Sequence, residues 1–198
     1  MRLRGTLQKE SQRRLQEVVK CLDRMNKGNN NTCIVLLSPE SMSIVSSPGG
    51  FNEAQAWATL TTVCPDGLGV FSQLRIESMQ DNRIGLEVEA SLLVLALKSA
   101  DAGEQTTIKL RNKDGRALLS FEIITQSIPM MTVIQDVPVK VLSAQQVDSV
   151  QEPAAADSPT VRLMSPPIKS LCTVVERLKC LDQRILLRGN MNGELEIG

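Results

Sequence analysis

The spacing of hydrophobic residues changes repeatedly between a two-residue and a helical repeat. Residues 1–6 alternate apolar with basic side chains, as a short strand does, and residues 7–27 then follow helical spacing until Gly28. Apolar and β-branched runs predict strands at 32–38, 41–46, 56–64, 70–77 and 83–88, and a leucine-rich stretch predicts a second helix at 90–100. Further strands are expected at 106–112, 116–125 and 132–142, with an Asp114-Gly115 hairpin turn between the first two.

The composition changes sharply at residues 143–158, where Gln, Ser, Ala, Asp and Pro153 replace the alternating apolar pattern. We expect an exposed connector there, between a first domain at 1–142 and a second at 159–198. The second region predicts a strand at 160–164, a helix from Pro166-Pro167 to about 180, and a hairpin from 183–188 and 194–197. The order strand, helix, strand, strand therefore occurs twice, which indicates a duplicated α+β domain whose second copy is incomplete.

The residue types present exclude most catalytic chemistry. The chain has no histidine, which removes the commonest general base near neutral pH and the commonest metal ligand. No phosphate-binding glycine loop or dinucleotide motif is visible, so we expect no catalytic residue, metal or cofactor. The five cysteines lack paired spacing and indicate reduced core thiols. The charged N-terminus and the lack of a long apolar run indicate a soluble protein without a secretion signal.

The first predicted helix carries a basic stripe on one face. At about 100° per residue, its cations fall within about 60° of one another, opposite an apolar side that suits burial against a sheet. Residues 1–27 hold eight basic and three acidic residues, net +5, although the whole chain has zero net charge. Such a stripe can neutralise phosphates without reading bases; the alternative is a merely solvated face. The stripe consists of Lys9, Arg13, Lys20, Arg24 and Lys27.

Several short motifs resemble a known family in order and spacing. They are DVPVKVL at 136–142, QEP at 151–153, VVERLK at 174–179 and NMNGEL at 190–195, with weaker similarity at MRLR (1–4), around Trp57 and at IKLRNK (108–113). The chain resembles the PCNA-like sliding clamps, and within them the Hus-one type subunit of the heterotrimeric nine-one-one DNA-damage checkpoint clamp. The resemblance implies an α+β clamp fold of antiparallel sheets with two helices per domain.

The resemblance also implies which residues act. Helices line the ring, so the basic stripe would face double-stranded DNA, extended by Lys98, Lys169 and Arg177. The strand at 116–125 would lie at the domain edge and pair with a neighbouring subunit, although an internal strand is equally open. Client peptides would dock on apolar residues of the connector, unless it is a passive linker. The interface residues expected are Arg116, Leu118, Ser120, Glu122 and Ile124, and the connector residues are Val147, Val150 and Pro153.

The function expected from this resemblance is a nuclear, non-enzymatic scaffold. It would assemble with two Rad-type subunits, be loaded on DNA by an ATP-dependent clamp loader, and recruit repair and checkpoint proteins. Two alternatives share the fold: a replicative homotrimeric processivity clamp, and a shortened regulator that caps a partner's edge without closing a ring. An enzyme would need a concave site with perturbed ionisable groups, which a chain without histidine makes improbable.

Overall fold

The computed structural model describes residues 1–25, 32–46, 56–125, 130–154, 158, 162, 164–182, 184–190 and 192–198. The chain forms two compact units, Met1–Glu152 and Pro153–Gly198. The division falls within the stretch 143–158 that the composition marks as a connector. The assignment of 1–142, 143–158 and 159–198 as domain, connector and second domain remains a prediction.

Unit 1 is built on one antiparallel sheet of nine strands, in the order β4-β3-β2-β6-β9-β8-β7-β1-β5. The strand β9 joins its two halves, because Val139–Val141 pair with β6 and Thr132–Pro138 pair with β8. The strands are β1 (Arg2–Leu7), β2 (Thr32–Leu37), β3 (Ser41–Ser46), β4 (Trp57–Thr61), β5 (Phe71–Glu77), β6 (Ile84–Glu89), β7 (Gly103–Lys113), β8 (Arg116–Thr125) and β9 (Thr132–Val141).

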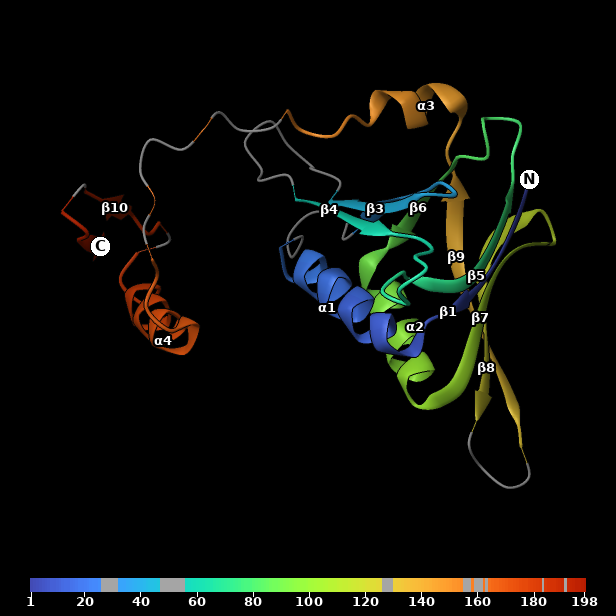
Figure 1. Ribbon diagram of the computed structural model, residues 1–198, viewed down its shortest axis with the longest axis horizontal. Helices are drawn as coiled ribbons and strands as arrows, with labels where there is room; N and C mark the ends of the chain where they lie inside the picture. Colours follow the sequence, from blue (N-terminus) through green and yellow to red (C-terminus); the bar gives the residue numbers. More distant parts are fainter. Residues whose placement is uncertain are drawn as a thin grey trace. The chain divides into compact units, whose positions relative to one another are not determined.

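Two helices, α1 (Lys9–Met25) and α2 (Ala90–Asp101), cover one face of this sheet. Figure 1 shows them side by side inside the bend between the two halves of the sheet. The core lies between helices and sheet because alternate strand residues point inward, where Phe121, Leu97 and Val19 are fully buried. In the described part of the chain, no helix combines the length and the apolar character needed to cross a membrane. The predicted α+β class with a large antiparallel sheet, as in PCNA-like clamps, is confirmed.

The predicted connector begins with a short packed helix, α3 (Ala144–Ser149). Ser143 caps it through a capping box with Gln146, in which each side chain binds the other residue's backbone N–H. Val147 is only 6% exposed and packs against Gly85, where a Cβ would lie 2.6 Å from the Val147 Cγ2 atom. The expectation of an exposed connector is therefore wrong for Val147, because a glycine in β6 leaves room for its side chain, while the other residues of α3 are exposed.

This packing predicts where proteases act first. We expect subtilisin to cut between 150 and 158 before it cuts within 144–149 or within 1–142, since cleavage requires local unfolding. Changing Val147 to Asp would bury a charge, release α3 and extend early cutting into 144–149. Gln145→Asp, on the exposed side of the same helix, is the matched control. Mass spectrometry of the first fragments checks this; early cuts inside residues 1–142 of the wild-type chain would contradict it.

The described residues of unit 2 form one helix and a two-stranded sheet. The helix α4 (Ile168–Leu178) follows Pro167 at its N-cap, and β10 (Leu187–Gly189) pairs antiparallel with β11 (Leu195–Ile197). Gly193 in the intervening turn has a φ of 83°, a conformation that favours glycine. The predicted helix and hairpin are present, while most of the expected strand at 160–164 lies outside the described residues.

Candidate nucleic-acid interface and subunit contacts

The helix α1 is held with one face against the sheet. Leu15, Val19 and Leu22 are 3% exposed or less. The Ser11 hydroxyl donates a hydrogen bond of 3.2 Å to the carbonyl of Leu68, which ties the first turn to the segment before β5. Because the apolar repeat fixes the rotation of the helix, the opposite face must carry the charged residues.

The basic stripe lies mostly in solvent. Lys9, Arg13 and Arg24 are exposed, and Lys20 is half-buried at the edge of the packed face. Lys27 lies outside the described residues. The described part of the stripe thus presents four cations along one helix, a geometry that suits phosphate contacts.

The helix α2 adds less charge than α1. Its Leu93, Ala96, Leu97 and Ala100 are buried, while Leu95 is 53% exposed. Lys98 is exposed in the last turn.

An acidic residue that sequence reasoning missed, Asp101, ends α2 beside the stripe. Its Oδ1 atom lies 3.6 Å from Nε of Arg13, with both side chains solvent-accessible. Such an exposed ion pair is worth about 0–1 kcal/mol, so Arg13 remains able to exchange Asp101 for a phosphate.

Lys169 and Arg177 are exposed on α4 of unit 2. Leu171, Val175 and Leu178 form the half-buried side of that helix. Both cations therefore lie off the apolar side, as the sequence pattern indicates. Their placement in a common DNA-lining surface with α1 remains a prediction.

The strand β8 is not an edge strand in unit 1. It pairs with β7 over its whole length on one side and with β9 over Leu118–Ile124 on the other. Its backbone groups are already used, so the expectation that 116–125 forms a free edge is wrong. Ser120 is fully buried and donates a hydrogen bond to Asp136. The Glu122 carboxylate forms ion pairs with Lys109 and Arg111. The predicted interface residues affected are Arg116, Leu118, Ser120, Glu122 and Ile124.

The free edge belongs instead to the first part of β9. Over Thr132–Pro138, β9 pairs with β8 only, and no other strand among the described residues occupies its second side. Val133 is 45% exposed and Ile134 54% exposed, next to the exposed Met130 and Met131. The sequence signal that could have revealed this edge is the pair of methionines followed by β-branched residues, a hydrophobic run that one sheet face cannot bury.

Two of the three predicted connector residues line a hollow on unit 1. Val147 and Val150 border a depression of about 200 Å³. Arg83 and Asp148 form an ion pair of 3.1 Å at the surface of the same region. Val147 is buried, so it holds α3 in place and is not free to meet a client peptide; Val150 is half-buried and Pro153 is exposed. The hollow is also lined by Leu36, Leu37, Ser38, Ser41, Ser43 and Ile84.

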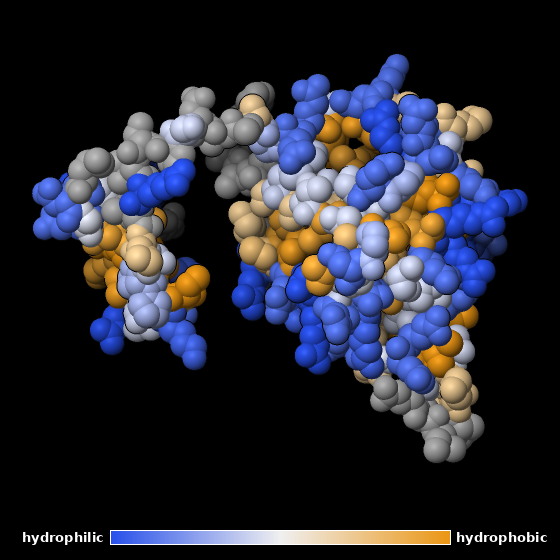
Figure 2. Space-filling model, in the orientation of Figure 1, coloured by the Kyte–Doolittle hydropathy of each residue, from blue (hydrophilic) through white to orange (hydrophobic). Residues whose placement is uncertain are grey.

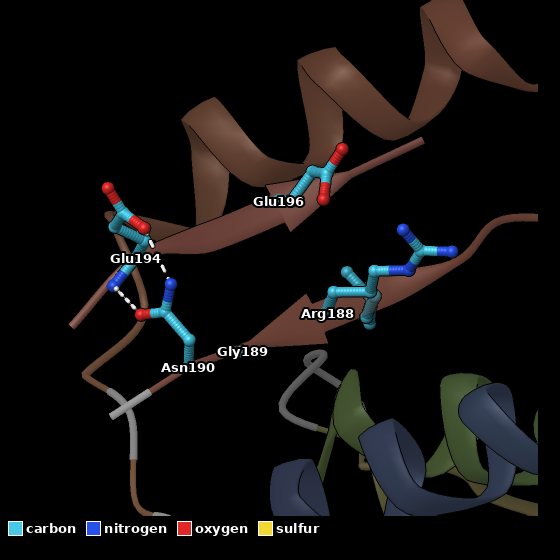
Figure 3. Close-up of a pocket in the computed structure, with 6 residues that line it drawn as sticks. Arg188, Gly189, Asn190, Glu194 and Glu196 are labelled. Carbon is cyan, nitrogen blue, oxygen red and sulfur yellow. Dashed lines mark hydrogen bonds between the residues drawn. The ribbon is translucent and has the colours of Figure 1, made fainter. Parts of the chain in front are cut away.

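A second hollow, on the hairpin of unit 2, has no catalytic constellation. Figure 3 shows Arg188 and Glu196 on the two strands and Asn190 and Glu194 at the turn. The Asn190 side chain accepts a hydrogen bond of 3.1 Å from the Glu194 N–H and donates one of 2.5 Å to its carboxylate. These contacts close the turn. Among the described residues, no cluster of His, Cys, Asp and Glu is arranged to hold a metal.

The sequence predicts core thiols, but three of the five cysteines are exposed. Only Cys33 is buried, while Cys21, Cys172 and Cys180 are exposed, and all five are free thiols. Burial, and then the charge of Asp23, raises the pKa of the Cys33 thiol to about 12.

This difference predicts selective labelling. At pH 8 a thiol with so high a pKa is almost fully protonated, so iodoacetamide should modify Cys33 at least ~10³-fold more slowly than the exposed cysteines. Raising the pH towards the pKa of Cys33 increases its thiolate fraction. Time-resolved peptide mass spectrometry of the native protein checks this, with the urea-unfolded chain as control. Equal rates in the native chain would show that Cys33 is accessible.

Comparison with known proteins places this geometry in a family. The model of a family described as Hus1-like protein matches residues 1–198. The chain is 30% identical over 185 residues to the checkpoint protein hus1 of Schizosaccharomyces pombe, which covers 92% of this chain and 61% of that protein.

Two further relatives agree. The human checkpoint protein HUS1 is 28% identical over 187 residues, covering 89% of this chain and 65% of the human protein. The checkpoint protein hus1 homolog of Dictyostelium discoideum is 26% identical over 172 residues, covering 84% of this chain and 61% of that protein. The chain spans about three fifths of the length of the curated relatives it matches. Since a family model covers its whole length, the chain belongs to the Hus1-like family.

Proposed function

We propose that the protein is a subunit of a DNA-damage checkpoint clamp that encircles double-stranded DNA. The observation that carries this proposal is the basic stripe of α1, displayed on the helical layer of a clamp-like sheet in a Hus1-like chain. Cations that contact phosphates hold duplex DNA without sequence preference, which sliding requires. Lys98, Lys169 and Arg177 would extend this lining. The role is topological and scaffolding, in the nucleus, with no catalysis by the chain itself.

The free edge of β9 supports assembly into a larger ring. Its unpaired backbone groups and the exposed Val133 and Ile134 suit a strand from a neighbouring clamp subunit, which would extend the sheet and bury the apolar side chains. Two different Rad-type subunits would complete the ring. An ATP-dependent loader would open it on damaged DNA, and repair and signalling proteins would bind the assembled clamp.

The hollow beside α3 supports a site for client peptides. It lies on unit 1 where the predicted connector begins, and Val150 offers a half-buried apolar wall. Arg83 and Asp148 at the same region supply a polar pair that can orient a peptide. Clients would contact Val150 and Pro153, with Val147 as the support beneath.

Assembly distinguishes this function from its alternatives. Mixing the chain with two Rad-type subunits of the same organism should give one complex containing one copy of each, measured by size-exclusion chromatography with light scattering. A replicative clamp would form a homotrimer of this chain alone. A capping regulator would bind one partner and prevent addition of the other. Either of these last results would overturn the proposal.

A further inference from the structure

Three neighbouring strands, β1, β5 and β7, carry cations on the sheet face opposite α1 and α2. In β1, Leu3 and Leu7 are buried while Arg2 and Arg4 are exposed; in β7, Ile108 is buried while Lys109 is half-buried and Arg111 is exposed. Figure 2 shows strongly hydrophilic residues gathered along the side of unit 1 where β1, β5 and β7 run in Figure 1. We call this set the outer basic face; it comprises Arg2, Arg4, Arg75, Lys109 and Arg111.

Strand register places three of these cations in one row. Arg4 of β1 lies directly opposite Arg75 of β5 on one side and Lys109 of β7 on the other. Like charges directly opposite one another destabilise a sheet, so this row lowers stability. Within the described part of the chain, Arg4 has no ion pair. Because this row of like charges lowers stability and folding does not require it, we expect it to have a function.

Two carboxylates lie within the face but do not neutralise it. Glu77 is shared between Arg2, at 3.8 Å, and Arg75, whose Nε donates a hydrogen bond of 2.8 Å. Glu122 is shared between Lys109 and Arg111. Five cations against two carboxylates leave a local surplus of three positive charges. This surplus calls for an anionic partner.

The row ends at an open sheet edge. β5 is the last strand of the sheet, so among the described residues its second side has no partner strand. Arg75 is in the middle of this strand, with its side chain 75% exposed. A polypeptide that added to β5 would place every second side chain over the outer basic face. Backbone hydrogen bonds to β5 would supply the affinity for this polypeptide, and the cations would select negatively charged side chains.

The alternation of charges favours a peptide over duplex DNA. A duplex carries one phosphate charge per ~1.7 Å of its axis and would meet Glu77 and Glu122 as well as the cations. A strand can instead place a carboxylate beside Arg75 and a neutral residue beside Glu77, because its side chains repeat every two residues on one face. A peptide strand can pair with the hydrogen-bonding edge of β5, whereas the phosphates of a duplex have no matching strand of N–H and C=O groups. The face also carries no aromatic residue on which unpaired bases would stack.

We infer that the outer basic face and the β5 edge form a docking site for an acidic, extended peptide segment of a partner protein. The peptide adds as an extra strand beside β5, and its Asp, Glu or phosphorylated side chains meet Arg75 and Arg4. This site lies on the opposite sheet face from the proposed DNA-lining stripe, so it is separate from the proposed function and its failure leaves that function untouched.

The experiment uses the full chain and a fluorescein-labelled short peptide that alternates glutamate with valine. Fluorescence anisotropy should show binding that weakens as salt rises from about 0.05 to 0.3 M. Changing Arg4 and Arg75 together to Glu should weaken binding at least about tenfold, because two attractive contacts become repulsive. Hydrogen exchange at the β5 amides should slow when the peptide binds.

Three controls make the result decisive. A peptide with lysine in place of glutamate should not bind, and the stripe variant Arg13→Glu, Lys20→Glu, Arg24→Glu should bind the acidic peptide as the wild type does. Arg4→Glu alone should raise the thermal midpoint, since it places an acid between Arg75 and Lys109, and it should also weaken peptide binding, so the loss in this single variant cannot be attributed to misfolding. No binding of the acidic peptide, or equal binding by the double variant, would overturn the site. Binding of a duplex that depends on Arg4 and Arg75, without peptide binding, would assign the face to DNA instead.

Discussion

Changing Arg13, Lys20 and Arg24 together to Glu should weaken binding of the assembled clamp to duplex DNA by roughly 10²- to 10³-fold at about 0.1 M salt. Each lost phosphate contact lowers the slope of log K against log salt by about 0.9, so three contacts remove nearly 3 from the slope. The loss should be equal for unrelated DNA sequences, because phosphate contacts carry no base information. Titrations at several salt concentrations measure both quantities.

The stripe variant should fold and assemble normally. Arg13 and Arg24 are exposed and Lys20 is half-buried, while the apolar face of α1 is unchanged. Single exposed substitutions usually alter stability by only about 0.5 kcal/mol, although three reversals on one face can cost more. Glu10→Gln with Glu17→Gln, on the same helix, is the matched control and should bind DNA at least as well as the wild type. Wild-type affinity and salt slope in a correctly assembled triple variant would show that the stripe is only a solvated face.

Replacing Val133 and Ile134 with Lys should abolish assembly with the neighbouring clamp subunit. Both side chains are about half exposed in the single chain, so folding tolerates the change. In a sheet continued between subunits, two unpaired charges would be buried, at about 3–5 kcal/mol for each, and lysines on an edge strand also oppose pairing. The dissociation constant should therefore rise by 10²-fold or more. Analytical ultracentrifugation of the mixed subunits measures it.

The strand β8 provides the control for this experiment. Arg116→Glu and Leu118→Lys alter β8, whose Leu118–Ile124 segment is paired on both sides within unit 1, so assembly should persist. If the β8 variant blocked assembly and the β9 variant did not, the subunit contact would lie where the sequence resemblance first placed it. The circular dichroism spectrum of each variant confirms that the sheet is intact.

Features fixed by neighbouring residues could be predicted from the sequence. The Asp114-Gly115 pair predicts a tight hairpin, and both residues have positive φ, 53° and 77°, as the turn between β7 and β8 requires. The burial of Leu15, Val19 and Leu22 follows the apolar repeat of α1. Because that repeat fixes which side of the helix is packed, the exposure of Arg13 and Arg24 was also predictable.

Features that depend on distant pairing could not be predicted. Hairpin chemistry makes β7 and β8 neighbours, but it does not say which strand covers the second side of β8. That position is taken by β9, and the free edge therefore moves to Thr132–Pro138. Besides the hydrophobic run at Met130–Ile134, Pro138 is a second local sign, since a residue without an N–H suits a place where ladder bonding is incomplete.

The helix α3 depends both on neighbouring residues and on a contact with a distant residue. Ser143 and Gln146 form the S-x-x-Q pattern of a capping box, a signal that the polar composition of 143–158 obscured. The burial of Val147 depends on Gly85, a residue far away in the sequence. No local sequence pattern links Val147 to Gly85, so the burial of Val147 could not be predicted.

The most direct test of the central proposal is whether the assembled clamp is linked topologically to DNA. After loading with ATP and the loader, the complex containing this chain should remain on closed circular DNA through a wash at high salt, which screens the stripe contacts. Cutting the circle with a restriction enzyme should then release it from the free ends. Quantification of this chain on the DNA before and after cutting gives the answer. Dissociation from intact circles at high salt, or retention after linearisation, would contradict a ring that encircles DNA.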